Sequence, residues 1–173
     1  MFRAWGVVSM RARSRGRSRE ERRWRGSEHL ETAAVLLATL GRPLTSEALA
    51  LALELAGGGR IAVVGINRIY GTSFGLQNPG LFPTRREREE QLEIVRRAVQ
   101  DLVRAGGEAD GQVSATRHPE KTIAYLARRR EARAIVIDLV RRSWIRGVVE
   151  GSPARAVRRR VGPGVDVREV ITP

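Results

Sequence analysis

The sequence predicts a small doubly wound α/β domain, in which helices cover both faces of one parallel sheet. Two observations carry this prediction: five short apolar segments are typical of strands, and four helical segments alternate with them along the chain. A length of 173 residues suits one domain with a buried core, alone or with a tail. We therefore expect a Rossmann-like, three-layer α/β/α architecture.

The first 28 residues differ in composition from the rest and are predicted to be a disordered tail, with the domain spanning residues 29–173. This tail has no hydrophobic period and carries nine arginines against three glutamates. It is interpreted as an arm that binds nucleic acid, as a solvated tail, or as a stretch upstream of a true start codon at Met10 or later. Either of the last two is favoured over the arm, because charge runs are weak motifs.

The formal net charge of +13 suits a negatively charged partner such as nucleic acid. Residues 29–173 contribute 23 basic against 16 acidic side chains, a net of +7. Lys121 is the one lysine, and this preference for arginine is typical of a GC-rich genome. Codon preference is therefore expected to account for much of the basicity.

Cysteine is absent, which excludes disulfides, thiolate metal sites and a cysteine nucleophile. Only His29 and His118 are available for histidine chemistry. No apolar run approaches the roughly 18 residues that span a bilayer, and the N-terminus carries arginines in place of an apolar signal core. We expect a soluble cytoplasmic protein without a membrane segment.

The first half of the domain is predicted to be a β-α-β unit with a right-handed crossover. Residues 32–40 are apolar at consecutive positions, as in a central strand covered on both faces. After a Gly-Arg-Pro break, Thr45 or Ser46 can cap a helix over residues 48–56. Residues 60–66 then form the second buried strand.

A long loop over residues 67–83 follows, with three glycines and two prolines. Loops of this length in compact domains are usually functional or mobile. Its aromatic residues Tyr70, Phe74 and Phe82 either cover a pocket or pack the loop against the domain, and both interpretations stay open.

The next helix begins at Thr84, with Glu87 three residues on in a capping-box pattern. Its buried stripe is expected to comprise Leu92, Val95, Val99 and Leu102. Residues 112–116 form the third strand, and residues 118–130 form a helix with Ile123, Leu126 and Ala127 turned inward.

His118 lies where a strand hands over to a helix, at the edge that bears ligands in open α/β sheets. For a lone histidine, a capping or solvated role is favoured over a ligand-binding one.

The segment over residues 134–160 combines a strand, a basic loop and a helix start. Residues 134–137 are apolar and form the fourth strand, while Ser152 suits the N-cap and Pro153 the first helical position. A helix N-terminus presents free N–H groups and the positive end of the dipole, so such a loop commonly faces an anion such as phosphate. Residues 165–171 make a fifth, edge-like strand.

Two of these segments carry a family resemblance that covers about residues 31–172. The strand over residues 35–39, Gly41 and the helix SEALALALELA resemble the opening of the universal stress protein family. Members that bind ATP carry a Gly, two residues, a second Gly, nine residues and then Gly-Ser or Gly-Thr after the fourth strand. Here Asp138 and Arg141 stand at the first two positions, followed at the same spacing by Gly151 and Ser152.

The resemblance implies the fold of the adenine nucleotide α hydrolase-like group, with strand order 3-2-1-4-5 and a homodimer that often uses the last strand. It also implies an adenine-nucleotide site, with ATP as the family's ligand. The positions implied as contacts are Thr39, Leu40, Gly41, Val64, Ile137, Asp138, Arg141, Ser143, Gly151 and Ser152.

Three departures from the family pattern predict that nucleotide binding is weakened or altered. Leu40 replaces the acidic residue that contacts adenosine and cannot accept its hydrogen bonds. Asp138 and Arg141 replace glycines that let backbone approach phosphate, and Asp138 adds a negative charge there. In the other direction, Arg141, Arg142 and Arg146 can pair with phosphate, Ser143 and Ser152 can donate to it, and Asp138 can reach a ribose.

Three functions follow. The favoured one is a non-catalytic, dimeric stress-response or signalling protein with an unidentified protein partner. The second is an enzyme of the same fold that cleaves or transfers phosphate, although the sequence holds no Walker loop and no paired carboxylates at a metal-binding spacing. The third is nucleic-acid binding through residues 1–28.

Overall fold

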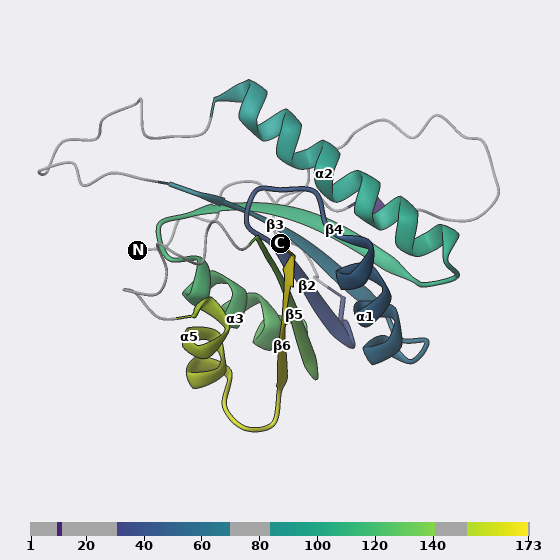
Figure 1. The fold of residues 1–173 in the computed structure, drawn as a ribbon, viewed down its shortest axis with the longest axis vertical. Coiled ribbons are helices and arrows are strands. Elements are labelled where there is room, and N and C mark those ends of the chain that lie inside the picture. The colour runs from purple at the N-terminus through teal and green to yellow at the C-terminus, as the bar shows by residue number, and fades with distance from the viewer. Residues whose placement is uncertain (1–9, 12–30, 70–83, 141–151, 173) are drawn as a thin grey trace, which may run out of the picture.

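A sheet of six strands forms the centre of the protein in the computed structural model, which describes residues 10–11, 31–69, 84–140 and 152–172 (Figure 1). The strands are β1 (Met10–Arg11), β2 (Val35–Thr39), β3 (Ile61–Arg68), β4 (Ala109–Thr116), β5 (Ala134–Val140) and β6 (Asp166–Thr172). The helices are α1 (Ser46–Ala56), α2 (Arg85–Arg104), α3 (Pro119–Arg129) and α5 (Pro153–Val161).

Five of the strands are parallel and confirm the predicted order 3-2-1-4-5, which here runs β4-β3-β2-β5-β6. The central strand β2 pairs with β3 on one side and β5 on the other, so Val35 lies beside both Ile61 and Ala134. All five residues of β2 are buried, as its unbroken apolar run predicted.

The sixth strand, β1, was not predicted. Met10 pairs with Gly111 and Arg11 with Asp110, in the antiparallel sense, at the outer edge of β4. These two residues are the part of the arginine-rich tail that the structure describes, and the rest of residues 1–28 lies outside it.

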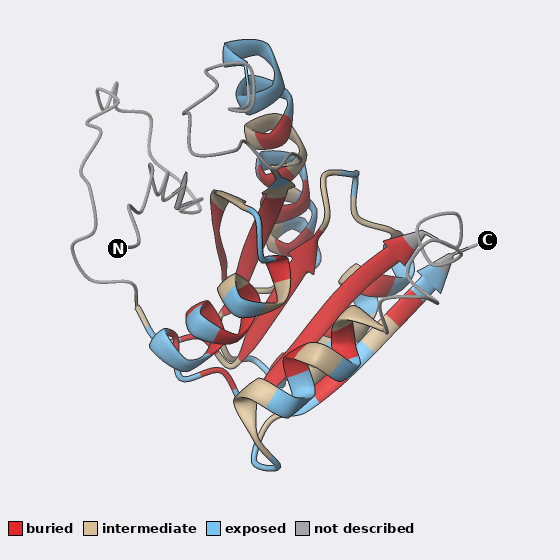
Figure 2. Cartoon of the chain, turned by 90° about the vertical axis from the view of Figure 1, so that its left-hand side faces the viewer, coloured by how far each residue is buried: buried red, intermediate tan, exposed pale blue. Residues whose placement is uncertain are grey.

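Helices α1 and α2 cover one face of the sheet, and α3 and α5 cover the other (Figure 1). Each face of the sheet has its own hydrophobic core, and successive side chains of β2 point into the two cores alternately. Val35 and Leu37 pack toward α1 and α2, while Leu36 and Ala38 pack toward α3 and α5. Figure 2 shows the buried strands between helices whose outer sides are exposed. The predicted three-layer architecture is confirmed. Within the described segments, no helix is both long and apolar enough to cross a membrane.

The helix starts follow the local signals in the sequence. Thr45 is the N-cap of α1, and its hydroxyl accepts the N–H of Ala48. Thr84 and Glu87 form the predicted capping box of α2. Pro119 and Pro153 occupy the first turns of α3 and α5, where their missing N–H groups leave no bond unmade.

Two details of α2 and β3 differ from the prediction. Gln91 is buried and Leu92 only half-buried, because the amide of Gln91 turns inward and donates to the carbonyl of Gly41 at 3.1 Å. Strand β3 continues to Arg68, inside the predicted loop, since its last residues pair in register with β4 up to Thr116. The remainder of that loop, residues 70–83 with its three aromatic side chains, lies outside the described residues.

A buried ion pair joins the C-terminal end of α3 to strand β4. Arg130, at the C-cap of α3, pairs with Asp110 on β4, and both side chains are almost fully enclosed. The backbone carbonyl of Arg130 also accepts the N–H of Ala33, just before β2, at 2.8 Å. Removing either charge would leave the other uncompensated in the interior.

Candidate functional site

The candidate site lies at the carboxyl ends of β2 and β5, where the strand order reverses. The helix after β2 packs on one face of the sheet and α5, after β5, packs on the other, so the two crossovers diverge here. Ligands of open α/β sheets bind at such a switch point. Thr39 and Asp138 face each other in register at the end of this strand pair.

Asp138 has its carboxylate turned toward the start of α1. Its Oδ2 atom accepts the backbone N–H of Thr45 at 2.7 Å, and its side chain is nearly buried. Oδ1 is also buried and has no hydrogen-bond partner in the described part of the chain. Burial raises the pKa of Asp138 above its ordinary value, against the opposing effect of the Thr45 hydrogen bonds. One oxygen is thus committed to α1, whose free N–H groups and dipole favour an anion.

The polar side chain at the end of β2 makes its hydrogen bonds to the turn that follows the strand. The hydroxyl of Thr39 donates to the carbonyl of Arg42 at 2.5 Å and accepts the N–H of the same residue at 3.3 Å. Gly41 has a φ of 85°, a conformation that side-chain-bearing residues rarely adopt. Leu40 is half-buried and packs against the core on the α3 and α5 side.

The N-terminus of α5, which the sequence predicts as an anion site, holds a carboxylate of the chain itself. Glu169 on β6 accepts both the hydroxyl of Ser152 and the backbone N–H of Ala154, the latter at 3.0 Å. The Ser152 hydroxyl oxygen also accepts the N–H of Arg155 at 3.4 Å, as an N-cap does. At this helix start Glu169 therefore engages the N–H of Ala154 and the Ser152 hydroxyl, while Ser152 itself caps the N–H of Arg155.

Glu169 was not among the residues predicted for the site. It lies 17 residues beyond Ser152 and reaches α5 only because β6 pairs with β5, with Ile137 beside Glu169 in register. The one signal in the sequence is that Glu169, with Arg168, lies between two buried valines, Val167 and Val170, of a short strand.

The other predicted positions divide into two groups. Val64 and Ile137 are fully buried in the core on the α3 and α5 side, so ligand contact there is limited to their backbone. Arg141, Ser143 and Gly151 lie outside the described residues, as do Arg142 and Arg146. His118 is exposed at the N-cap of α3, and its side chain makes no capping hydrogen bond. Its backbone N–H donates to the Thr116 hydroxyl at 3.0 Å.

A hollow of about 610 Å³ lies between the start of α1 and the outer side of α2, and Leu44 in its lining directly precedes Thr45. Leu44, Leu49 and Ile94 line it together with charged side chains of α2. Those charges are largely paired along the helix, as in Arg86 with Glu90. Within the described segments, no three acidic or histidine side chains gather in a way that could hold a metal ion.

Comparison with known proteins agrees with this fold. A model of the universal stress protein family matches residues 32–162. Among solved structures, a universal stress protein in complex with cAMP aligns with a TM-score of 0.56 and 20% identity, over 83% of this chain and 100% of that one. No curated protein sequence matches the chain.

Two further solved structures share the fold. The universal stress protein from Archaeoglobus fulgidus in complex with dAMP aligns with a TM-score of 0.52 and 21% identity, over 80% of this chain and 98% of that one. A protein of the same family from Burkholderia pseudomallei aligns with a TM-score of 0.54 and 20% identity, over 80% and 96%.

Proposed function

Because the chain belongs to the universal stress protein family, we propose that it is a non-catalytic stress-response or signalling protein whose binding of adenine nucleotides is weakened. Adenine nucleotides are the ligand class to consider, since two proteins of the same fold were solved with dAMP and with cAMP. The weakening concerns the phosphate side of the site.

The observation that carries the proposal is that a carboxylate of the chain occupies each of the two helix starts at the switch point. Asp138 accepts from Thr45 at the start of α1, and Glu169 accepts from Ser152 and Ala154 at the start of α5. A phosphate entering this edge would compete for the same donors and meet like charge. Both helix starts at the switch point are thus engaged by carboxylates of the chain itself, which supports weakened phosphate binding.

The absence of catalysis is supported by the same contacts. Among the described residues, Asp138 on β5 and Glu169 on β6 are each held by backbone or hydroxyl donors of a helix start. A general base must instead reach the proton or water that it activates. A phosphate-release assay with ATP and Mg²⁺ tests this part, and turnover above a no-enzyme control would contradict it.

Calorimetry tests the weakened binding, with ATP, AMP, dAMP and cAMP titrated into the full chain. The wild type is expected to bind with dissociation constants of about 1 mM or weaker. Glu169→Gln keeps an acceptor for Ala154 but removes the charge, which in water repels a phosphate charge 4 Å away by about 1 kcal/mol. It is therefore expected to bind ATP about fivefold more tightly.

The matched control is Glu54→Gln, which makes the same change of charge on an exposed side chain of α1. It is expected to leave nucleotide binding unchanged. Micromolar binding of ATP by the wild type would contradict the proposal. An equal gain in ATP affinity in both variants would show that the effect comes from the net charge of the protein and not from the position of Glu169.

We also propose that the protein is a homodimer formed through β6. This strand is the outermost of the sheet and pairs with β5 on its inner side only, among the described residues. An open strand edge offers unpaired N–H and C=O groups to a second copy, and Ile171 on it is 46% exposed. Light scattering during gel filtration should give twice the monomer mass, and Ile171→Asp should shift it toward the monomer.

A further inference from the structure

The charge of the described domain is divided unequally between its two helical faces. Helices α1 and α2 together carry six arginines against seven acidic side chains, a net of −1. Helices α3 and α5 carry seven basic side chains against one acidic, Glu120, a net of +6. A genome-wide preference for arginine codons explains why these cations are not lysines. It does not explain why one face carries one acid in its helices and the other seven.

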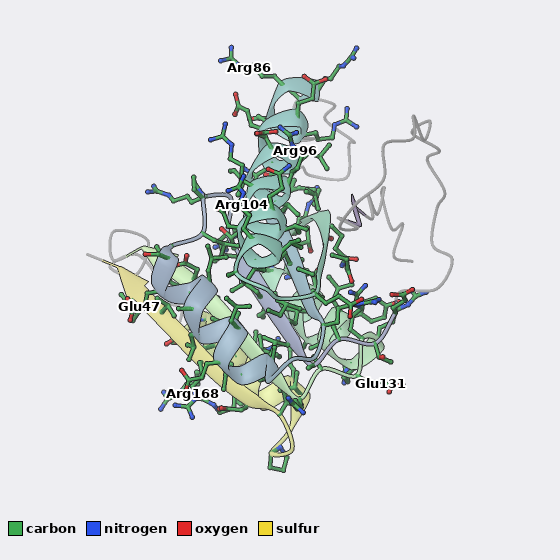
Figure 3. The ribbon with its side chains drawn as sticks, turned by 90° about the vertical axis from the view of Figure 1, so that its right-hand side faces the viewer. Glu47, Arg86, Arg96, Arg104, Glu131 and Arg168 are labelled. Carbon is green, nitrogen blue, oxygen red and sulfur yellow. The ribbon has the colours of Figure 1, made fainter. Side chains whose placement is uncertain are left out.

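The arginines of the two faces also differ in their partners. On α2 they are interspersed with acids, and all but Arg88 have an ion-pair partner along the described helix, as Arg85 has Glu89 and Arg97 has Glu93. Figure 3 shows Arg86, Arg96 and Arg104 along this helix. On α3 and α5, the ion pair is Arg160 with Glu120 at 3.6 Å. The side chains of Arg117, Lys121, Arg128, Arg155 and Arg159 are exposed and have no ion-pair partner among the described residues.

These cations are exposed on α3, on α5 and just before α3, and we call them the basic face: Arg117, Lys121, Arg128, Arg129, Arg155 and Arg159, with Tyr125 also exposed on α3. Lys121, Tyr125 and Arg129 are spaced four apart on α3, as are Arg155 and Arg159 on α5, so each set lies on one side of its helix. The two helices pack against each other on the same side of the sheet (Figure 1).

Tyr125 is the exposed aromatic residue of this surface. Its side chain is 52% exposed, and its hydroxyl accepts a hydrogen bond from Arg129 at 2.9 Å. An exposed ring held beside guanidinium groups can stack on a nucleic-acid base while the arginines reach phosphates.

We propose that the basic face binds nucleic acid through its phosphate backbone, independently of base sequence. Arginine's planar fork pairs with phosphate bidentately, and unpaired surface cations release the counterions of a polyanion on binding. A membrane surface fits less well, because its binding also draws on buried apolar area. In the described part of the chain, Tyr125 and Ile171 are the exposed large apolar side chains, and Ile171 lies on β6.

Fluorescence anisotropy of the full chain with a labelled, mixed-sequence 30-nucleotide DNA strand tests the proposal. One variant carries Lys121→Gln, Arg128→Gln, Arg155→Gln and Arg159→Gln. Each lost phosphate contact lowers the slope of log K against log salt by about 0.7 for a single strand. The slope should therefore fall by roughly 3, with at least tenfold weaker binding at about 100 mM salt.

A matched control carries Arg85→Gln, Arg86→Gln, Arg88→Gln and Arg97→Gln on α2. It removes the same number of positive charges from the opposite face of the sheet. A third variant carries Arg13→Gln, Arg15→Gln, Arg17→Gln and Arg19→Gln in the tail. Both are expected to keep most of the affinity, and circular dichroism checks that all variants are folded. If the four-site variant of the basic face does not fold, the pair Arg155→Gln and Arg159→Gln replaces it, with half the loss of slope.

Three outcomes would overturn the proposal. The first is that the wild type does not bind the strand at about 50 mM salt. The second is that the α2 or tail variant loses as much affinity as the variant of the basic face. The third is binding to phosphatidylserine vesicles, lost in that variant, without binding to DNA.

Discussion

Asp138 accepts the backbone N–H of Thr45 at 2.7 Å, and this one hydrogen bond joins the end of β5 to the start of α1 across 93 residues of sequence. Thr45 is itself the N-cap of α1. The carboxylate therefore satisfies a donor in the first turn and places a negative charge at the positive end of the helix dipole. On the α1 side of the switch point, the helix start is thereby engaged by Asp138.

Two substitutions separate the hydrogen bond of Asp138 from its charge. Asp138→Asn keeps an acceptor for Thr45, whereas Asp138→Ala leaves that partly buried N–H without one. A fully buried unsatisfied donor costs about 1–3 kcal/mol, so the alanine variant is expected to be less stable than the asparagine variant by about 1 kcal/mol. Urea denaturation measures the difference, and equal midpoints for the two variants would show that the bond contributes nothing.

The raised pKa of Asp138 predicts how stability depends on pH. Because its native pKa lies above the ordinary 3.8, the native state keeps a proton that the unfolded chain releases. The free energy of unfolding contributed by this group therefore falls as the pH rises through the window between the two values. Relative to Asp138→Asn, the wild type should lose stability as the pH is raised above about 4.

Comparing the two proteins at each pH cancels the other titrating groups. Urea midpoints at several pH values give the difference in unfolding free energy. A difference that is flat, or that favours the wild type increasingly at higher pH, would contradict the raised pKa.

The fold was predictable where the signal is local. Thr45, the Thr84 and Glu87 capping box, and Ser152 with Pro153 mark helix starts within four residues of sequence, and the apolar run of β2 marks a strand covered on both faces. Such patterns depend on backbone geometry that neighbouring residues determine.

The contacts of the candidate site were not predictable in the same way. Asp138 and Glu169 reach helix starts on other segments only after the strands have paired in register. The same holds for Asp110 and Arg130, which lie 20 residues apart on separate elements. A carboxylate in a sequence looks equally suited to a ligand or to a helix start, and only tertiary packing decides between them.

The buried pair of Asp110 and Arg130 should be costly to break on one side. Asp110→Ala leaves the guanidinium of Arg130, 2% exposed, without its counter-charge, and such changes cost about 3–5 kcal/mol. Replacing both residues, Asp110→Ala with Arg130→Met, should recover much of this loss because no buried charge remains. Urea denaturation of the single and double variants measures both effects.

The exposed pair of Asp101 and Arg104 is the control for this experiment. Its acid is 47% exposed and its base 72% exposed, so Asp101→Ala should cost about 1 kcal/mol or less. If Asp110→Ala is no more harmful than Asp101→Ala, the enclosed pair does not have the electrostatic role assigned to it.

Gly111 lets α2 lie directly on β4. A Cβ at this position would overlap Val95 and come within 3.0 Å of Val99, both buried residues of α2. Gly111→Ala should therefore cost about 1–3 kcal/mol by overpacking. Adding Val95→Ala removes the overlap, so the double variant should lose about 0.5–3 kcal/mol less than the sum of the two single losses. Gly164→Ala, where a Cβ meets nothing within 4 Å, should be neutral or slightly stabilising. Additive losses at Gly111 and Val95 in thermal or urea unfolding would show that the helix does not rest on this glycine.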